Sequence, residues 1–128
     1  MKNTSSKTIV LIDDEEYICQ IVQTCVEVFS DWKVIAARSG KEGLAAIATA
    51  QPDAILLDIL MPNMDGFAVL KRLKASTTLV DIPIVLLTAR ADLAEAHKIA
   101  ELGVQGIIVK PFHPTQITSE ISQILSWV

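Results

Sequence analysis

Five polar side chains stand directly after short apolar runs of the sequence, and their types suit phosphoryl chemistry. Asp13, Asp14 and Asp58 are carboxylates, Thr88 carries a hydroxyl and Lys110 an ammonium. Oxygen ligands without a neighbouring His or Cys favour a hard cation, and Mg²⁺ is the common cellular choice, often together with a phosphate. The lysine can neutralise a carboxylate or a phosphoryl oxygen. Brought together, these residues predict a site that binds Mg²⁺ and a phosphoryl group, with Asp58 as the nucleophile.

Each of these residues also has an ordinary structural explanation when it is taken alone. Adjacent acids after a strand can cap the next helix and face the positive end of its dipole, as the run from Asp13 to Glu16 would do. Lys110 would then be a solvated lysine and Thr88 a capping residue. Ca²⁺ is disfavoured because the sequence has no EF-hand loop spacing. We favour the shared site because all of these side chains follow predicted strands.

The predicted strands are five apolar runs at broadly even intervals. Each run is of strand length and rich in β-branched residues or leucine. Apolar runs that continue without alternation are typical of strands buried on both faces of a parallel sheet. The five runs are Thr8 to Ile12, Lys33 to Ala37, Ala54 to Leu57, Ile84 to Leu87 and Gly106 to Val109.

Helical patterns lie between and after these runs. Apolar residues recur at steps of three and four, which predicts amphipathic helices. They are Ile18, Ile21, Val22, Cys25, Val26 and Phe29 near the start, and Ile117, Ile121, Ile124, Leu125 and Val128 at the end. Weaker patterns predict helices over Lys41 to Ala50, Asp65 to Ala75 and Asp92 to Leu102, the last closed by Gly103.

Alternation of strand and helix predicts an α/β fold, a doubly wound, five-stranded parallel sheet flanked by five helices. Ligands of such sheets bind beyond the carboxyl ends of the strands, where the strand order reverses. Four predicted strands end in the polar residues above, whereas the second ends only in Ala37-Arg38-Ser39. The order 2-1-3-4-5 puts the second strand at an edge and brings the four marked ends together. We therefore predict this flavodoxin-like order.

Length and composition indicate one domain. The chain has 128 residues, of which 51% are apolar and 20% charged. We predict a flexible N-terminal arm over residues 1–7 and one folded domain over residues 8–128. A net charge of −4 without a basic stripe argues against direct nucleic-acid binding. No apolar run approaches the roughly 18 residues that span a bilayer, so we expect no membrane insertion and a cytoplasmic location. Cys19 and Cys25 are expected to be small buried residues and not a disulfide.

In these motifs and their order the chain resembles the response-regulator receiver family of two-component signalling. The resemblance extends from about Thr8 to the C-terminus. Its motifs are Asp13-Asp14, the segment from Pro52 to Pro62 with Asp58 inside it, Asp65-Gly66, Pro83 to Ala89 with Thr88, and Lys110-Pro111-Phe112. The resemblance implies a receiver domain over residues 8–128 that takes a phosphoryl group from a phosphohistidine. A histidine kinase or histidine phosphotransfer protein would be the donor, and a downstream protein would read the altered surface.

The resemblance also implies a role for each site residue. Asp58 would be the phosphoacceptor. Asp14, Asp58 and the backbone carbonyl of Leu60 would coordinate Mg²⁺ directly, while Asp13 would act through a bound water. Lys110 would hold a phosphoryl oxygen. Thr88 would move inward to the phosphorylated Asp58 and so shift the loop and helix that follow it. The peptide bond before Pro111 would be cis, as is usual in the family.

Two positions depart from the family pattern. Ile107 stands where the family usually has Tyr or Phe, so we expect activation to be expressed mainly through the loop after Thr88 and the helix from Asp92 to Leu102. Leu60 and Arg90 flank the path of the hydrolytic water in the family. An apolar Leu60 should order that water poorly, which predicts a long-lived phosphoryl group.

Two other functions, phosphate hydrolysis and cofactor binding, also occur in proteins with similar features. A phosphohydrolase of the haloacid-dehalogenase type needs a second acid two residues after its nucleophile, and that position is Leu60. A flavodoxin-like cofactor binder needs a phosphate loop that the acids from Asp13 to Glu16 would repel. We therefore expect a switch with slow autodephosphorylation and not a turnover enzyme. Because this chain ends with its fifth predicted helix, we expect a stand-alone receiver. The alternative is a receiver fragment of a longer multidomain regulator or hybrid kinase.

Overall fold

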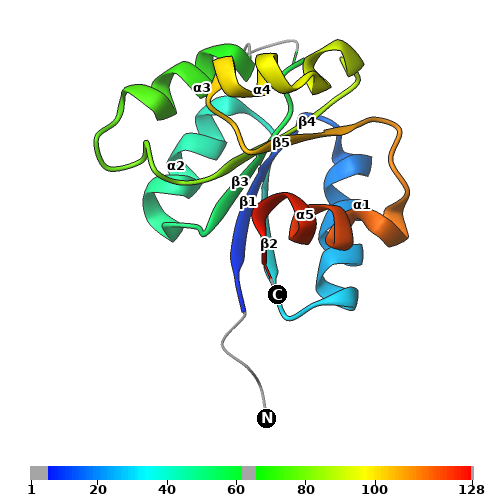
Figure 1. The fold of residues 1–128 in the computed structure, drawn as a ribbon. Coiled ribbons are helices and arrows are strands. Elements are labelled where there is room, and N and C mark those ends of the chain that lie inside the picture. The colour runs from blue at the N-terminus through cyan, green and yellow to red at the C-terminus, as the bar shows by residue number, and fades with distance from the viewer. Residues whose placement is uncertain (1–5, 62–65, 128) are drawn as a thin grey trace.

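Five parallel strands form one sheet in the order β2-β1-β3-β4-β5 (Figure 1). This computed structural model describes residues 6–61 and 66–127. The strands are β1 (Thr8–Ile12), β2 (Lys33–Ala37), β3 (Ala54–Leu57), β4 (Ile84–Thr88) and β5 (Gly106–Val109). The predicted strand order is confirmed, and so are the predicted strands. β4 runs one residue further than expected because Thr88 still pairs with Val109.

The helices agree with the predicted pattern except in one region. They are α1 (Glu16–Phe29), α2 (Gly40–Ala50), α3 (Gly66–Ala75), α4 (Ala96–Leu102) and α5 (Ile117–Leu125), with 3₁₀ turns η1 (Ala91–Ala94) and η2 (Pro114–Gln116). Pro62 and Asp65 of the predicted motifs, and Val128 of the last helical pattern, lie outside the described residues.

The single helix predicted from Asp92 to Leu102 is wrong, because the backbone breaks at Glu95. Glu95 is extended, with φ −67° and ψ 136°, and it separates η1 from α4. Leu93 is the buried residue of η1, and α4 buries none of its residues fully. Short helices depend on tertiary packing more than on propensity. This segment has few apolar anchors, so its pattern was not enough to hold one continuous helix.

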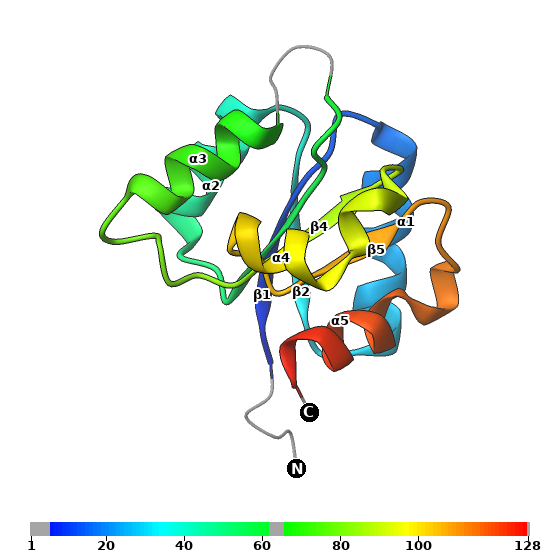
Figure 2. The same ribbon diagram turned by 45° about the horizontal axis from the view of Figure 1, so that its top comes forward.

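Helices cover both faces of the sheet. Helices α1 and α5 lie on one side, and α2, α3 and α4 on the other (Figure 2). Alternate residues of each strand serve the two faces: Ile9 and Leu11 of β1 pack toward α1 and α5, whereas Val10 and Ile12 pack toward α2 and α3. Both faces are therefore buried, which explains the uninterrupted apolar strands.

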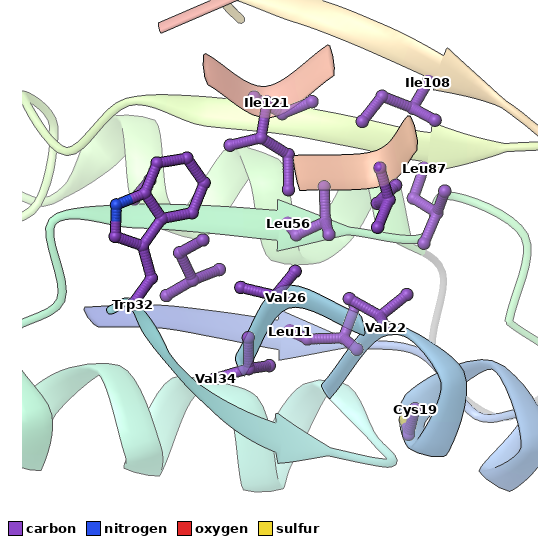
Figure 3. Close-up of a cluster of buried hydrophobic side chains, with 14 residues drawn as sticks. Leu11, Cys19, Val22, Val26, Trp32, Val34, Leu56, Leu87, Ile108 and Ile121 are labelled. Atoms are coloured by element: carbon purple, nitrogen blue, oxygen red, sulfur yellow. The ribbon is translucent and has the colours of Figure 1, made fainter. Parts of the chain in front are cut away.

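Figure 3 shows the core on the side of α1 and α5. Val22 and Val26 of α1 meet Ile121 of α5 over the strands. At one end of this core Trp32 packs edge to face against Trp127, with ring centroids 5.0 Å apart. Among the described residues no helix is long and apolar enough to cross a membrane.

Neither cysteine forms a disulfide among the described residues, and the start of the described chain is held by hydrogen bonds. Cys19 is buried and Cys25 partly buried, and both are free thiols, as expected. Ser6 donates a hydrogen bond to the carbonyl of Asp31, and the carbonyl of Lys7 accepts one from the amide of Lys33. Residues 1–5 lie outside the described residues, so the boundary of the arm stays a prediction.

Candidate functional site

The sheet itself holds the backbone of the site residues in place. The amide of Asp13 donates to the carbonyl of Ala37, and the amide of Asp58 donates to the carbonyl of Ile12. In the same way the amide of Lys110 donates to the carbonyl of Thr88. Each bond continues the ladder of a strand for one residue beyond its end. Side chains from β1, β3 and β5 are therefore fixed at one edge of the sheet, at the upper ends of the strands in Figure 1.

Three carboxylates gather at this edge. Asp13, Asp14 and Asp58 each offer an oxygen, and these oxygens lie within 4.8 Å of one another. Asp13 and Asp58 are buried. One oxygen of each is held by a backbone amide, because Oδ1 of Asp13 accepts from the amide of Glu15 and Oδ1 of Asp58 accepts from the amide of Leu60, both at 2.9 Å.

Burial raises the pKa of both buried acids above the ordinary value for aspartate. Loss of hydration is the main cause for Asp13 and for Asp58, and the charge of Asp13 adds to it at Asp58. Hydrogen bonds from backbone amides and from Lys110 act in the opposite direction but do not cancel the effect. The protein alone therefore leaves part of the negative charge at this edge uncompensated.

Lys110 brings the one ammonium that reaches these acids in the described part of the chain. Its Nζ lies 2.8 Å from Oδ2 of Asp13, 3.1 Å from Oε1 of Glu15 and 3.3 Å from Oδ2 of Asp58. Burial alone would favour the neutral amine, but the Asp13 carboxylate outweighs burial and raises the pKa of Lys110. The lysine is therefore charged and clamped among acids. The peptide bond to Pro111 is cis, as the resemblance implied.

Thr88 lies at the neighbouring strand end but is engaged elsewhere. Its buried hydroxyl accepts a hydrogen bond from the amide of Arg90 at 3.1 Å and makes none with Asp58. The guanidinium of Arg90 pairs with Asp92, at 2.8 Å for the shorter contact. The structure thus brings four of the five predicted side chains into contact range and leaves the hydroxyl of Thr88 as a neighbour.

The acid cluster fits a hard divalent cation. All of its potential ligands are oxygens, and the raised pKa values of Asp13 and Asp58 show that added positive charge would be favourable there. Asp14 is only partly buried, so the cluster is open on one side. The carbonyl of Leu60 as a ligand, and a water between Asp13 and the ion, stay predictions.

Gly66 lets α3 begin close to the backbone that follows β3, which the sequence motif did not explain. A Cβ atom at this position would lie 2.4 Å from the carbonyl oxygen of Asp58 and 2.5 Å from Cα of Ile59. The amide of Gly66 donates to the carbonyl of Ile59. Only glycine allows α3 to start this close to the backbone that carries Asp58.

Glu15 is a site residue that the sequence did not single out. It occupies the N-cap position of α1, yet its side chain makes no capping hydrogen bond. The carboxylate instead contacts Lys110. The only signal for this contact in the sequence was a third acid following Asp13 and Asp14.

Comparisons with known proteins decide which family this site and fold represent. The family model described as the response regulator receiver domain matches residues 9–122 of the chain. The chain belongs to the response regulator receiver family. The geometry at the strand ends is therefore that of a receiver domain. Receiver domains act as signalling switches and not as turnover enzymes, so the haloacid-dehalogenase and cofactor-binding alternatives are set aside.

Relatives with curated descriptions are identical to this receiver domain at about a third of the aligned positions. It is 34% identical over 121 residues to the probable transcriptional regulator ycf27 of Cyanophora paradoxa, covering 94% of this chain and 49% of the relative. It is 35% identical over 120 residues to the alkaline phosphatase synthesis transcriptional regulatory protein PhoP of Bacillus subtilis, covering 94% and 49%. The chain thus spans about half the length of these relatives.

Solved structures agree on the fold of the receiver domain. The chemotaxis protein CheY4 of Vibrio cholerae superposes with a TM-score of 0.81 at 27% identity, covering 91% of this chain and 97% of that one. The receiver domain of a signal transduction histidine kinase from Syntrophus aciditrophicus superposes with a TM-score of 0.77 at 28% identity, covering 94% and 90%. Similar receivers therefore occur in proteins of different architecture.

Proposed function

We propose that this receiver domain accepts a phosphoryl group on Asp58 from a phosphohistidine and thereby works as a reversible switch. The observation that carries the proposal is a buried Asp58 whose Oδ2 lies 3.3 Å from the ammonium of Lys110, within the cluster that Asp13 and Asp14 complete. A carboxylate oxygen of Asp58 forms a bond to phosphorus while the phosphorus–nitrogen bond to histidine breaks. The imidazole nitrogen keeps the electron pair of that bond.

In this proposal Asp14, Asp58 and the carbonyl of Leu60 would hold Mg²⁺ directly, and Asp13 would hold it through a water. The ion supplies positive charge for the phosphoryl oxygens. Lys110 neutralises a further phosphoryl oxygen, and its contact with Asp58 already places the ammonium beside the acceptor.

The conformational response begins at Thr88. Its hydroxyl accepts from the amide of Arg90, at the start of the segment that leads into η1 and α4. A hydrogen bond from this hydroxyl to a phosphoryl oxygen would compete with the arrangement around Arg90. Phosphorylation can then shift the conformation of the segment after Thr88. The shift is limited by how much these contacts differ in free energy between the unphosphorylated and phosphorylated states.

The partners follow from the proposed chemistry. A histidine kinase or histidine phosphotransfer protein donates the phosphoryl group to this domain in the cytoplasm, and a downstream protein reads the changed surface. The domain itself makes no direct contact with nucleic acid and does not insert into a membrane. Alternatively, the domain serves inside a longer regulator or hybrid kinase. The regulators ycf27 and PhoP, about twice as long as this chain, favour the first of these arrangements, and the Syntrophus aciditrophicus kinase offers the second.

Mass spectrometry of the intact protein tests the acceptor. The protein is incubated with Mg²⁺ and phosphoramidate, and Asp58→Ala is compared with Asp81→Ala, which removes an exposed acid elsewhere. We expect one added phosphoryl group in the wild type and in Asp81→Ala, and none in Asp58→Ala. Omission of Mg²⁺ should abolish the addition. A phosphoryl group that persists in Asp58→Ala would refute the assignment.

A further inference from the structure

Lys110 is surrounded by more carboxylates than phosphoryl binding requires. An ammonium has three N–H donors, and three carboxylates lie within 3.3 Å of Nζ: Asp13, Glu15 and Asp58. A phosphoryl oxygen that binds Lys110 therefore competes with these carboxylates for the ammonium. Two of these acids belong to the proposed metal site, and Glu15 is the third.

Glu15 differs from the other two acids in its exposure. Its side chain is 56% exposed, whereas that of Asp13 is fully buried and that of Asp58 nearly so. The carboxylate of Glu15 thus contacts Lys110 from the solvent side. A lysine that is itself only 13% exposed can meet solvent through few other directions.

The contact between Glu15 and Lys110 does not arise from helix capping. Glu15 is the N-cap residue of α1, but its side chain makes no capping hydrogen bond. Its amide is held by Oδ1 of Asp13, which sets the backbone without using the Glu15 carboxylate. The Glu15 carboxylate is therefore not needed for the start of α1. We expect its replacement by the isosteric amide of glutamine to leave that helix start unchanged.

We propose that Glu15 is a positioning residue that competes with the phosphoryl group for Lys110 and so restrains phosphorylation of Asp58. While Glu15 holds the ammonium toward the solvent side, Lys110 is less available to an incoming phosphoryl oxygen. This role rests on the proposed phosphorylation of Asp58 and acts on its rate. It requires no contact between Glu15 and the metal or the reacting phosphorus.

Replacement of Glu15 by glutamine tests the competition, and Glu16→Gln is its matched control. Glu16 is the next residue, also exposed, and pairs with Arg38 at 3.0 Å instead of with Lys110. Both variants remove one negative charge. At saturating Mg²⁺ and with acetyl phosphate as donor, we expect Glu15→Gln to phosphorylate about two- to fivefold faster than wild type, the scale of a partly exposed ion pair. Glu16→Gln should match the wild type, and equal rates for the two variants would overturn the proposal.

A double-mutant cycle separates competition for Lys110 from simple repulsion of the anionic donor. If Glu15 acts through the lysine, Glu15→Gln should have no effect on the rate in a Lys110→Ala background. An acceleration of the same size in that background would show repulsion of the donor and would overturn the positioning role.

A metal-free measurement keeps the test independent of phosphorylation. Hydrogen exchange of the Lys110 ammonium, followed by nuclear magnetic resonance, should be faster in Glu15→Gln than in wild type and unchanged in Glu16→Gln. If the wild type takes up no phosphoryl group, the proposed function fails while this readout still tests the contact. Unchanged exchange in Glu15→Gln would mean that Glu15 does not hold the lysine.

Discussion

At the scale of single residues, the site combines acids that the folded protein does not fully compensate. Asp13 and Asp58 are buried with raised pKa values, and Lys110 is the only cation in contact with them among the described residues. Such a cluster destabilises the metal-free protein and favours binding of a cation. Function and stability therefore oppose each other at these positions.

Asp58→Asn should stabilise the metal-free protein at neutral pH. The amide keeps the shape of the carboxylate and removes a charge that burial disfavours, so we expect the free energy of unfolding to rise by about 0.5–2 kcal/mol. Because the pKa of Asp58 is raised in the folded state, the charge costs most above that pKa. The advantage of Asn should shrink as the pH falls through the folded pKa and vanish below the unfolded pKa. Denaturant titrations over this range would measure it.

Mg²⁺ should make the wild type more stable than Asp58→Asn, which reverses the order expected for the metal-free proteins. Binding to the folded state stabilises the wild type by mass action, whereas Asp58→Asn lacks a ligand and should gain much less. Asp81→Asn, an exposed acid outside the site, serves as the control and should follow the wild type in both conditions. A lower stability of Asp58→Asn without metal would contradict the electrostatic account.

Leu60 and Arg90 bear on the lifetime of the phosphorylated state. Leu60 is 50% exposed and offers no polar side chain to a hydrolytic water, and the guanidinium of Arg90 is held by Asp92. We therefore expect slow loss of the phosphoryl group, and faster loss in Leu60→Gln, which places an amide beside that water. Time courses of intact mass after removal of the donor would measure both rates. A wild-type half-life of seconds would contradict this.

At the scale of elements, the helices are anchored unequally. Helix α1 buries Cys19, Val22 and Val26, whereas α4 has seven residues and buries none fully. Weakly packed segments open at low free energy and are the usual carriers of conformational change. Because η1 and α4 follow Thr88, the proposed switch residue and a weakly anchored element lie close together in the chain.

Amide chemical shifts with and without a phosphoryl mimic would locate the response. We expect the largest changes from Ala89 to Leu102, because Thr88 is coupled to this segment through Arg90 and because Ile107 has no aromatic ring to rotate. Amides in the middle of α2, which lies on the edge strand β2 and away from Thr88, serve as the internal reference. Changes absent from Asp92 to Leu102 would reject this route.

At the scale of the whole molecule, the site and a stabilising contact lie at opposite ends of the sheet. Trp32 comes just before β2, and Trp127 just after α5, whereas the site lies beyond the carboxyl ends of the strands. Lys7 adds a cation 5.4 Å from the ring of Trp127. This group joins the start of β1 to the end of α5.

Trp127→Ala should therefore weaken the fold without changing the site. Loss of the edge-to-face contact and of a partly buried ring should lower the free energy of unfolding by about 1–3 kcal/mol. Mg²⁺ affinity, measured by calorimetry, should stay at the wild-type value. Val28→Ala, at a position 70% exposed, is the control and should change stability by less than about 0.5 kcal/mol. A large loss of Mg²⁺ affinity in Trp127→Ala would contradict the separation.

Several features could be predicted from the sequence because they are written in neighbouring residues. The apolar runs such as Thr8 to Ile12 indicated buried strands, since burial on both faces removes the polar alternation. Polar residues, among them Asp13, Asp58 and Lys110, come directly after those runs. Their convergence on one site followed from the rule that the carboxyl ends of parallel strands share one edge of the sheet. Strand order and most of the candidate site were therefore predictable.

Only the tertiary structure decided the contacts that join distant segments. The break at Glu95 depends on how few apolar side chains anchor η1 and α4. The need for glycine at position 66 arises from backbone that passes within 2.4 Å of a Cβ there. Glu15 and Lys110 meet across 95 residues of chain. Their contact depends on the packing of α1 against η2 and α5, the segments that follow Lys110, which no local pattern of residues encodes.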